Sequence, residues 1–443
     1  MTYRELLAGN ADFRRLWTGQ VVSEIGDWLN NIAVLALAIQ LAGAGRVGLA
    51  VATYAIARHL PLFIFGPVAG VVVDRVSRRR VMIAADVTRA VLALGFMLAN
   101  RAGSLALIYV VGASLFSVSA FFNAAKRASI PNLVGATDEL LAANSLSAST
   151  TAATIAVGSA LGGVIATALG RDTVFVLNAL TFLASAEMIR RIRKPVSRGQ
   201  RAESSEDKSR RSPSSNTTPR RSPLTAYFTD FREGLRYVRR DRVLAAVFVV
   251  AGGWGLGNGA ARALYSLFGA SLGAQAAVRW GASVHAVAER PTDFGISVLF
   301  VAMGLGGVLG APLARRFNSG AVEGLGARMG RSLTLDGCGL LLFSLTPNLF
   351  GAAALLIARE MNFAIWWTAQ QTLLMRRTED AFAGRVFASY ETLTTLMMVG
   401  SILVSGAAAD RLGMRAVAAG GGTVIILSGL LWFVLRRRNR ETA

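Results

Sequence analysis

Four polar side chains follow one another along a single face of the first long apolar stretch. They are, in chain order, Gln20, Glu24, Asp27 and Asn31. Steps of four, three and four residues bring side chains to the same side of an α-helix. An ionised carboxylate at mid-bilayer costs at least ~2.5–3.5 kcal/mol, so these groups must face a cavity or a partner. We predict that Glu24 and Asp27 bind protons or attract cations. The alternative for Asp27 is a hydrogen bond that only holds a neighbouring helix.

The second apolar stretch also carries charge. Arg58 and His59 lie near its middle. A buried arginine stays charged and needs a carboxylate or several carbonyl oxygens, so we predict Asp27 or Glu24 as the partner of Arg58. We interpret that pair as a gate or proton switch, or else as a static ion pair. We interpret His59 as a polar residue whose hydrogen bonds are satisfied locally.

The second half of the chain offers a further set of polar and aromatic side chains within apolar stretches. We predict that the following residues line the same cavity: Trp254, Asn258, Arg359, Glu360, Trp366 and Gln370. Arg262 follows Asn258 at helical spacing. Glu360 is expected to point about 100° away from Arg359. Packing is the alternative role for the tryptophans, and Asp336 has no predicted partner.

The composition defines the elements that must position these groups. Of the 443 residues, 53% are hydrophobic and 16% are charged, whereas soluble proteins carry about 25% charged residues. Apolar stretches of roughly 20 residues, the thickness of a bilayer core, recur along the whole chain. They are continuous rather than alternating, which favours helices over a β-barrel. The sequence therefore predicts an all-α polytopic membrane protein with about twelve transmembrane helices.

The predicted spans lie near residues 17–42, 47–72, 80–100, 104–125, 140–168, 172–190, 243–268, 293–314, 330–347, 349–375, 385–409 and 415–435.

The charge is strongly positive, with a formal net value of +21. The arginines gather at both ends of the chain and in alternate loops, which the positive-inside rule explains without nucleic-acid binding. Both termini are therefore predicted to be cytoplasmic. One cysteine, Cys338, and two separated histidines make neither a disulfide nor a metal motif. No G-x-x-x-x-G-K-[ST] motif occurs, which disfavours an internal ATPase. We predict no metal and no cofactor.

A polar segment divides the chain. Residues 191–242 separate an N-terminal six-span half, 1–190, from a C-terminal one, 243–443. Its Ser-, Pro- and Arg-rich part predicts disorder through about residue 223. Apolar residues then recur at helical spacing, which predicts an amphipathic helix on the inner membrane surface. We interpret the basic part as a solvated tether rather than a nucleic-acid or lipid-binding element.

The turn after the second span reads G-V-V-V-D-R-V-S-R-R-R and is the predicted conformational hinge. Its residues are Gly70, Asp74, Arg75, Arg78 and Arg79. Asp74 is expected to hold helix ends together through helix dipoles and arginines, and to release them on opening. Similar turns follow spans five, eight and eleven, for example G-A-A-A-D-R-L-G-M-R from Gly406. They indicate two halves related by pseudo-twofold symmetry. Asp86 and Arg89, three residues apart, are expected to pair and support the hinge.

Several motifs together resemble the major facilitator superfamily (MFS) over the whole chain. The hinge turn is similar to its signature G-x-x-x-D-R-x-G-R-[RK], with Ser77 in place of the second glycine. Four further motifs resemble the efflux branch of this superfamily. They are G-D-W-L-N in span one, A-A-D-V-T-R-A in span three, F-F-N-A-A-K-R-A-S-I-P-N-L-V at the exit of span four and D-F-R-E-G-L-R-Y-V-R-R-D before span seven. That branch includes macrolide exporters and enterobactin-type siderophore exporters. Span five departs from the antiporter pattern, with Ser159 where a proline is usual.

The resemblance implies a secondary active transporter that exports a small amphipathic molecule by alternating access. The implied substrate is a drug, antibiotic or siderophore-like compound, and the implied driving force is a proton gradient. A lysophospholipid flippase and a solute uptake carrier are alternatives of the same fold. A membrane-embedded lipid enzyme is a more remote one, because no nucleophile–base pair is evident. The expected location is the bacterial inner membrane, and the expected state is a monomer.

Overall fold

The computed structural model describes residues 3–43, 45–134, 137–193, 223–280, 285–318 and 324–440, and all regular secondary structure in these ranges is helical. The N-terminal half contains α1 (Tyr3–Gly9), α2 (Ala11–Leu41), α3 (Val47–Arg75), α4 (Arg78–Ala102), α5 (Leu105–Leu133), α6 (Thr137–Leu169) and α7 (Arg171–Arg190). The segment between the halves contains α8 (Pro223–Val238). The C-terminal half contains α9 (Arg242–Trp280), α10 (His285–Glu289), α11 (Pro291–Asn318), α12 (Leu325–Leu345), α13 (Leu349–Arg377), α14 (Asp380–Leu412) and α15 (Met414–Arg440).

A long helix lies at each of the twelve predicted spans. Within the described residues, eleven of these helices are long and apolar enough to cross a membrane. The twelfth is α12, whose 21 residues include Arg328, Arg331 and Asp336. Three charges in so short a helix lower its mean hydropathy, although its length matches the bilayer core. The all-helical membrane fold predicted from composition is confirmed.

Some helix ends differ from prediction. The fourth span was expected to end near residue 125, but α5 continues through Lys126 and Pro131 to Leu133. The seventh was expected to end near residue 268, but α9 continues to Trp280. Helices can extend beyond the apolar stretch because their backbone bonds do not depend on hydropathy, and water solvates the projecting turns.

The helix predicted after the polar segment corresponds to α8. It packs on α14, where Glu233 lies 3.2 Å from Arg385 and the Ser389 hydroxyl donates to the Phe231 carbonyl at 3.1 Å. The predicted disorder before it falls on residues 194–222, which lie outside the described residues.

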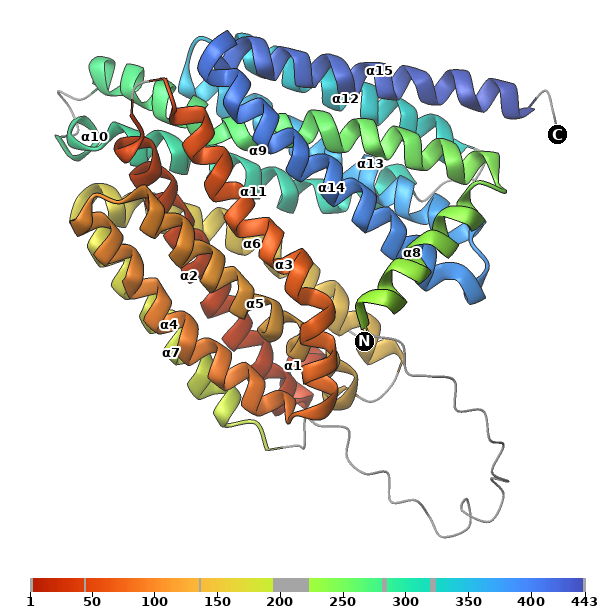
Figure 1. The fold of residues 1–443 in the computed structure, drawn as a ribbon, viewed down its shortest axis with the longest axis horizontal. Coiled ribbons are helices and arrows are strands. Elements are labelled where there is room, and N and C mark those ends of the chain that lie inside the picture. The colour runs from red at the N-terminus through yellow and green to blue at the C-terminus, as the bar shows by residue number, and fades with distance from the viewer. Residues whose placement is uncertain are drawn as a thin grey trace.

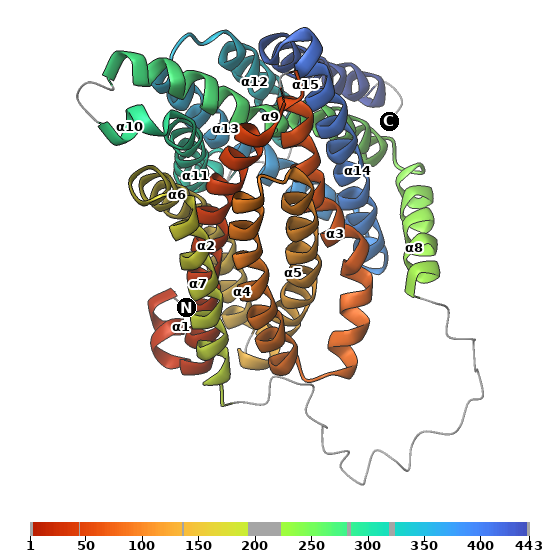
Figure 2. The same ribbon diagram turned by 60° about the vertical axis from the view of Figure 1, so that its left-hand side comes forward.

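The two halves lie against each other and spread apart toward one end of the molecule (Figures 1 and 2). We call the end that carries the α2–α3, α6–α7 and α14–α15 connections the bridged end. The opposite end, with α1, the α3–α4 turn and α8, is the basic end. Across the halves, α6 packs on α11 and α3 packs on α14.

Small residues allow this close approach. A Cβ atom on Gly48 of α3 would lie 2.3 Å from the Gly406 carbonyl oxygen of α14. A Cβ on Gly304 of α11 would likewise lie 2.3 Å from the Ala156 nitrogen of α6. Both helix pairs therefore depend on glycine for backbone-to-backbone contact.

Candidate functional site

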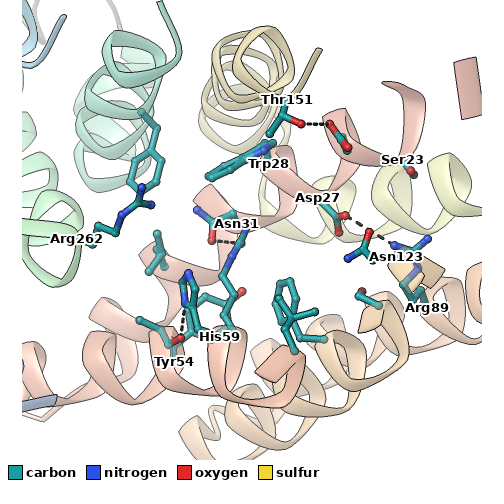
Figure 3. Close-up of a pocket in the computed structure, with 18 of the residues that line it drawn as sticks. Ser23, Asp27, Trp28, Asn31, Tyr54, His59, Arg89, Asn123, Thr151 and Arg262 are labelled. Atoms are coloured by element: carbon teal, nitrogen blue, oxygen red, sulfur yellow. Dashed lines mark hydrogen bonds and ion pairs between the residues drawn. The ribbon is translucent and has the colours of Figure 1, made fainter. Parts of the chain in front are cut away.

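A cavity of about 340 Å³ lies between the halves, and we call it the central cavity (Figure 3). Among the predicted site residues, those that border it are Gln20, Glu24, Asp27, Asn31 and Arg58. Most of the wall comes from α2, α3 and α5. The C-terminal half contributes Arg262, Tyr265, Phe300, Met303 and Ile402. The polar face of α2 therefore looks into a cavity rather than into lipid.

Glu24 is held in place by several groups. Lys126 of α5 lies 3.5 Å from its carboxylate. The Gln20 amide donates to it at 2.8 Å, and the hydroxyls of Thr154 and Thr151 donate at 3.1 Å and 3.4 Å. A carboxylate with a cation and three donors is stabilised as a fixed anion.

Asp27 is held much more loosely. Arg89 of α4 is 3.9 Å away, and that guanidinium already pairs with the fully buried Asp86. The Asp27 side chain is 22% exposed, toward the cavity, whereas Asp86 is 0% exposed. The predicted pairing of Asp86 with Arg89 is confirmed. Arg89 also lies over the ring of Phe122 at 4.1 Å, which fixes it against one wall.

Arg58 does not take the predicted partner. It donates to the Asn31 side-chain oxygen at 2.6 Å, and its guanidinium lies 4.9 Å from the Trp28 ring and 4.8 Å from the Phe116 ring. The prediction of an ion pair with Asp27 or Glu24 is wrong because Arg58 faces α2 at Asn31, one turn beyond Asp27. His59 shares a hydrogen bond with the Ala55 carbonyl at 2.8 Å, as its interpretation as a locally satisfied residue expected.

The predicted residues of the C-terminal half are not among those that border the central cavity in the described part of the chain. Arg359 is buried and pairs with Asp336 at 3.0 Å. It also donates to Asn258 at 3.1 Å and to the Tyr265 hydroxyl. Asp336 thus has a partner that the sequence did not reveal. The Glu360 carboxylate lies 3.6 Å from Arg359 rather than serving another neighbour.

The aromatic candidates form a packed cluster. The Trp254 ring lies 4.7 Å from the Trp366 ring and 5.6 Å from the Phe363 ring, while Gln370 donates to Tyr390. Trp254, Trp366 and Gln370 are all buried. Helical spacing placed these groups on shared faces, but the face of α9 turns toward α13 and the face of α13 turns toward α9 and α14. Tyr265, which borders the cavity and contacts Arg359, links the two regions.

Replacing Arg359 with glutamine is expected to destabilise the folded protein by about 3–5 kcal/mol, because it leaves the buried Asp336 charge without its cation. The measurement is the free energy of unfolding in detergent micelles. Arg331→Gln, at an exposed position of α12, serves as the control and should change it by no more than about 0.5 kcal/mol. Equal stability of the two variants would contradict the assigned pairing.

The predicted hinge residues lie together at the basic end. Asp74 and Arg75 are exposed at the last turn of α3, and the space beside Gly70 is open. Arg78 donates to the Ala128 carbonyl of α5 at 2.5 Å, and Arg79 donates to the Arg190 carbonyl of α7. The two arginines thus fasten the turn to the rest of its half and leave Asp74 facing outward.

Contacts between the halves concentrate at the bridged end. The Asp410 carboxylate at the end of α14 accepts from the backbone nitrogens of Gly48 and Leu49, at 2.7 Å and 2.9 Å. These are first-turn N–H groups of α3 that lack a partner within their own helix. Arg171 lies 2.8 Å from Asp293, in the first turn of α11.

A second arginine reinforces the contact between α6 and α11. Arg290 donates to the carbonyls of Ala166 and Thr167 near the end of α6, at 2.7 Å and 3.1 Å. The acidic turn at the end of span eleven, which contains Asp410, is recognisable in the sequence, but its contact with α3 was not predicted. The repeat of that turn after several spans was the sequence signal from which this contact could have been predicted.

Within the described residues, no group of three or more His, Cys, Asp or Glu side chains is arranged to hold a metal ion. The chain is a polytopic helical protein with a polar cavity between two halves. A model of the Major Facilitator Superfamily matches residues 16–401, and the chain belongs to that family. It is therefore a membrane transporter and not an enzyme.

Similar proteins agree with this class. The uncharacterized MFS-type transporter YfiS of Bacillus subtilis is 24% identical over 431 residues, covering 95% of this chain and 92% of YfiS. BacE of Bacillus subtilis, a provisionally named bacilysin exporter, is 25% identical over 363 residues, covering 79% of this chain and 77% of BacE.

Two solved structures share the fold. The nucleoside transporter NupG gives a TM-score of 0.61 at 13% identity, covering 95% of this chain and 99% of NupG. A bacterial homologue of the human lysosomal transporter Spinster, solved in an inward-facing conformation, gives 0.63 at 12% identity and covers 96% of each chain.

Proposed function

We propose that this protein is a proton-coupled exporter of a small amphipathic molecule, which it moves across the bacterial inner membrane by alternating access. The observation that carries the proposal is a central cavity with one fixed and one loosely held carboxylate, Glu24 and Asp27, between halves that are joined at one end. An exporter needs a substrate cavity, a group that exchanges protons and a closed end, and these features supply all three.

The open end gives the substrate access from one side, in a state that the cycles of exporters and uptake carriers share. The positive-inside rule assigns the basic end to the cytoplasm, and the halves spread apart toward that end (Figure 1). The bonds of Asp410, Arg171 and Arg290 close the opposite end. In this arrangement the cavity receives its substrate from the cytoplasm or from the inner leaflet.

Asp27 is the proposed proton carrier. Its only ion pair among the described contacts is the 3.9 Å approach to Arg89, which Asp86 shares. A proton on Asp27 removes that weak attraction without breaking a buried pair, whereas a proton on Glu24 would leave Lys126 without its anion. Protonation of Asp27 from the outside, after substrate release, then favours return of the empty protein.

The test is transport by the full-length protein in liposomes of bacterial lipid. Macrolides, dyes, siderophores and a short-chain fluorescent lysophospholipid are assayed with and without a pH gradient, and with a protonophore. Uphill movement that requires the gradient and disappears with the protonophore supports the proposal. Lysophospholipid movement without a gradient would instead identify a flippase, and uptake with co-transported protons would identify an uptake carrier.

Replacing Asp74 with asparagine is expected to lower transport at least about tenfold, because closing the basic end brings this carboxylate to the first turn of α14. A carboxylate that accepts hydrogen bonds at a helix start stabilises that contact by roughly 1–3 kcal/mol. Membrane insertion and melting temperature should not change, since Asp74 is exposed. Arg80→Gln, at an exposed position in the same turn, is the control. Wild-type transport by Asp74→Asn in vesicles would contradict the hinge role.

A further inference from the structure

The central cavity contains more positive than negative charge. Arg58, Arg89, Lys126 and Arg262 border it, against Glu24 and Asp27 alone. Two of the cations are matched: Lys126 by Glu24 at 3.5 Å, and Arg89 by Asp86 and, more distantly, by Asp27. With the buried Asp86 counted, four cations stand against three carboxylates, so the excess is one positive charge. Arg58 and Arg262 are the two cations that have no carboxylate within 4 Å among the described residues, and Asp27 acts on Arg58 only from a longer distance.

Arg58 is oriented by neutral groups, and the Asp27 carboxylate acts on it only from beyond ion-pair distance. Asn31, an uncharged acceptor, receives one of its hydrogen bonds, and a guanidinium has five N–H donors. The rings of Trp28 and Phe116, both within 5 Å of the guanidinium carbon, hold its plane in position. Aromatic contacts of this kind orient a cation without supplying a counter-ion. Arg58 thus presents a fixed set of unused donors toward the cavity.

Arg262 borders the same cavity from the other half. It is exposed on α9 at the cavity wall, and within the described residues it has neither a hydrogen bond nor an ion pair within 4 Å. Glu360 interacts with it only through the longer-range field and lies 3.6 Å from Arg359 instead. Both Arg58 and Arg262 act electrostatically on His59, and Figure 3 shows Arg262 and His59 toward the same side of the cavity.

The wall beside these two arginines is apolar. Trp28 packs on Phe300 of α11, with ring centroids 6.1 Å apart, and Phe116 and Met303 also border the cavity. A ligand that satisfies this surface needs an aromatic or aliphatic body next to a single charged group. The volume of about 340 Å³ lies at the lower end of the range for small-molecule sites.

We infer that the cargo is an amphipathic organic anion, whose carboxylate, sulfonate or phosphate binds between Arg58 and Arg262 while its apolar part packs on Trp28 and Phe300. This inference rests on the proposed transport function and names its substrate class. Guanidinium groups out of bulk water are strongly stabilised by a bound anion, which they can contact through two parallel hydrogen bonds. The same two charges repel cationic drugs, which gives the site its selectivity. Because the arginines come from opposite halves, the bound anion also joins the halves across the cavity.

The inference is tested by calorimetric binding to the full-length protein in detergent micelles. The probes share one aromatic body and differ in charge: 1-naphthylacetate, 1-naphthylacetamide and 1-naphthylmethylammonium. We expect the anion to bind at least about tenfold more tightly than the amide, and the cation most weakly. Arg58→Gln and Arg262→Gln should each remove about tenfold of the affinity for the anion and leave that for the amide within about twofold.

Controls separate charge from folding. Arg262→Lys keeps the charge and should retain most of the preference for the anion, whereas Arg279→Gln, at an exposed position further along α9, should change nothing. Melting temperatures of all variants are compared with wild type. Equal affinity for the anion and the amide, or tighter binding of the cation, would overturn the inference. So would parallel loss of both affinities in a glutamine variant that melts like wild type.

Two further arms identify the source of the anion and keep the inference separate from the transport proposal. Lysophosphatidylglycerol and lysophosphatidylcholine of the same chain length are titrated in competition with naphthylacetate. Preference for the anionic lipid supports the inference with a lipid headgroup as the source, and displacement by neither lipid supports it with a water-soluble anion. If the anion binds but is not moved in liposomes, the transport proposal fails alone. If only cations or neutral compounds are moved, this inference fails alone.

Discussion

Replacing Asp27 with asparagine is expected to abolish proton-driven export, with a rate at or below about one hundredth of wild type, the scale on which loss of a proton-transferring group acts. Asparagine keeps the shape and one acceptor for Arg89 but cannot take or give up a proton. Exchange of labelled for unlabelled substrate across the membrane, which needs no net proton movement, should survive. The measurement is uphill transport and equilibrium exchange in the same liposomes, with an imposed pH gradient.

Two variants make the Asp27 result interpretable. Glu187→Gln removes an exposed carboxylate at the basic end that pairs only with Arg190 and Arg191 among the described contacts, and transport should be unchanged. Glu24→Gln should lower the melting temperature, since Lys126 loses its counter-ion. If Asp27→Asn still accumulates substrate at the wild-type level when driven by protons, then a group other than Asp27 couples transport to the proton gradient.

Replacing Gly406 with valine is expected to lower transport at least about 100-fold by preventing closure of the bridged end. A Cβ at this position would lie 2.3 Å from the Ala52 Cβ and 2.5 Å from the Gly48 carbonyl oxygen. The helices must separate to relieve that overlap, and the two bonds from Asp410 to the start of α3 would lengthen as well. Overpacking alone costs about 1–3 kcal/mol, and each charge-assisted bond adds about 1.5 kcal/mol or more.

The matched control for Gly406→Val is Gly400→Val, on the same helix, where a Cβ meets nothing within 4 Å. Both variants add the same side chain to α14. Spin labels at positions 101 and 279, one on each half at the bridged end, report the separation, with Cys338 replaced by alanine to leave no other thiol. A wild-type label distance and normal transport in Gly406→Val would show that the backbone contact is dispensable.

The membrane helices were predictable because span length and continuous hydropathy follow directly from bilayer thickness. The prediction was least direct for α12, where Arg328, Arg331 and Asp336 interrupt the apolar pattern. Asp336 is tolerated because Arg359 neutralises it from α13, and that pairing joins residues 23 positions apart. Periodicity within one helix contains no information about such a partner.

Of the residues that border the central cavity, only those of the N-terminal half were predictable from the sequence. Steps of three and four residues identified the polar face of α2, and charge in an apolar stretch implied that the face meets a cavity. The same argument failed for Trp254, Trp366 and Gln370, because helical spacing groups side chains on a face without stating which neighbour that face meets. Arg58 illustrates the related error: charge suggested a carboxylate partner, while the axial offset of α3 against α2 placed Asn31 there.

In the antiparallel pair of α3 and α14, each helix has an aspartate in its last turn, at the end of the pair where the other helix begins. Asp410 occupies the start of α3 at the bridged end, and Asp74 stands free at the other end of the same pair. If the halves rock as rigid bodies, only one of these two aspartates can contact the start of the opposite helix at a time. In the proposed hinge, bonds from Asp74 to the start of α14 would replace those that Asp410 loses, which offsets part of the cost of opening the bridged end. A bias of about 1.4 kcal/mol, the free energy of one pH unit for a single proton, is enough to change the ratio of the two conformations tenfold.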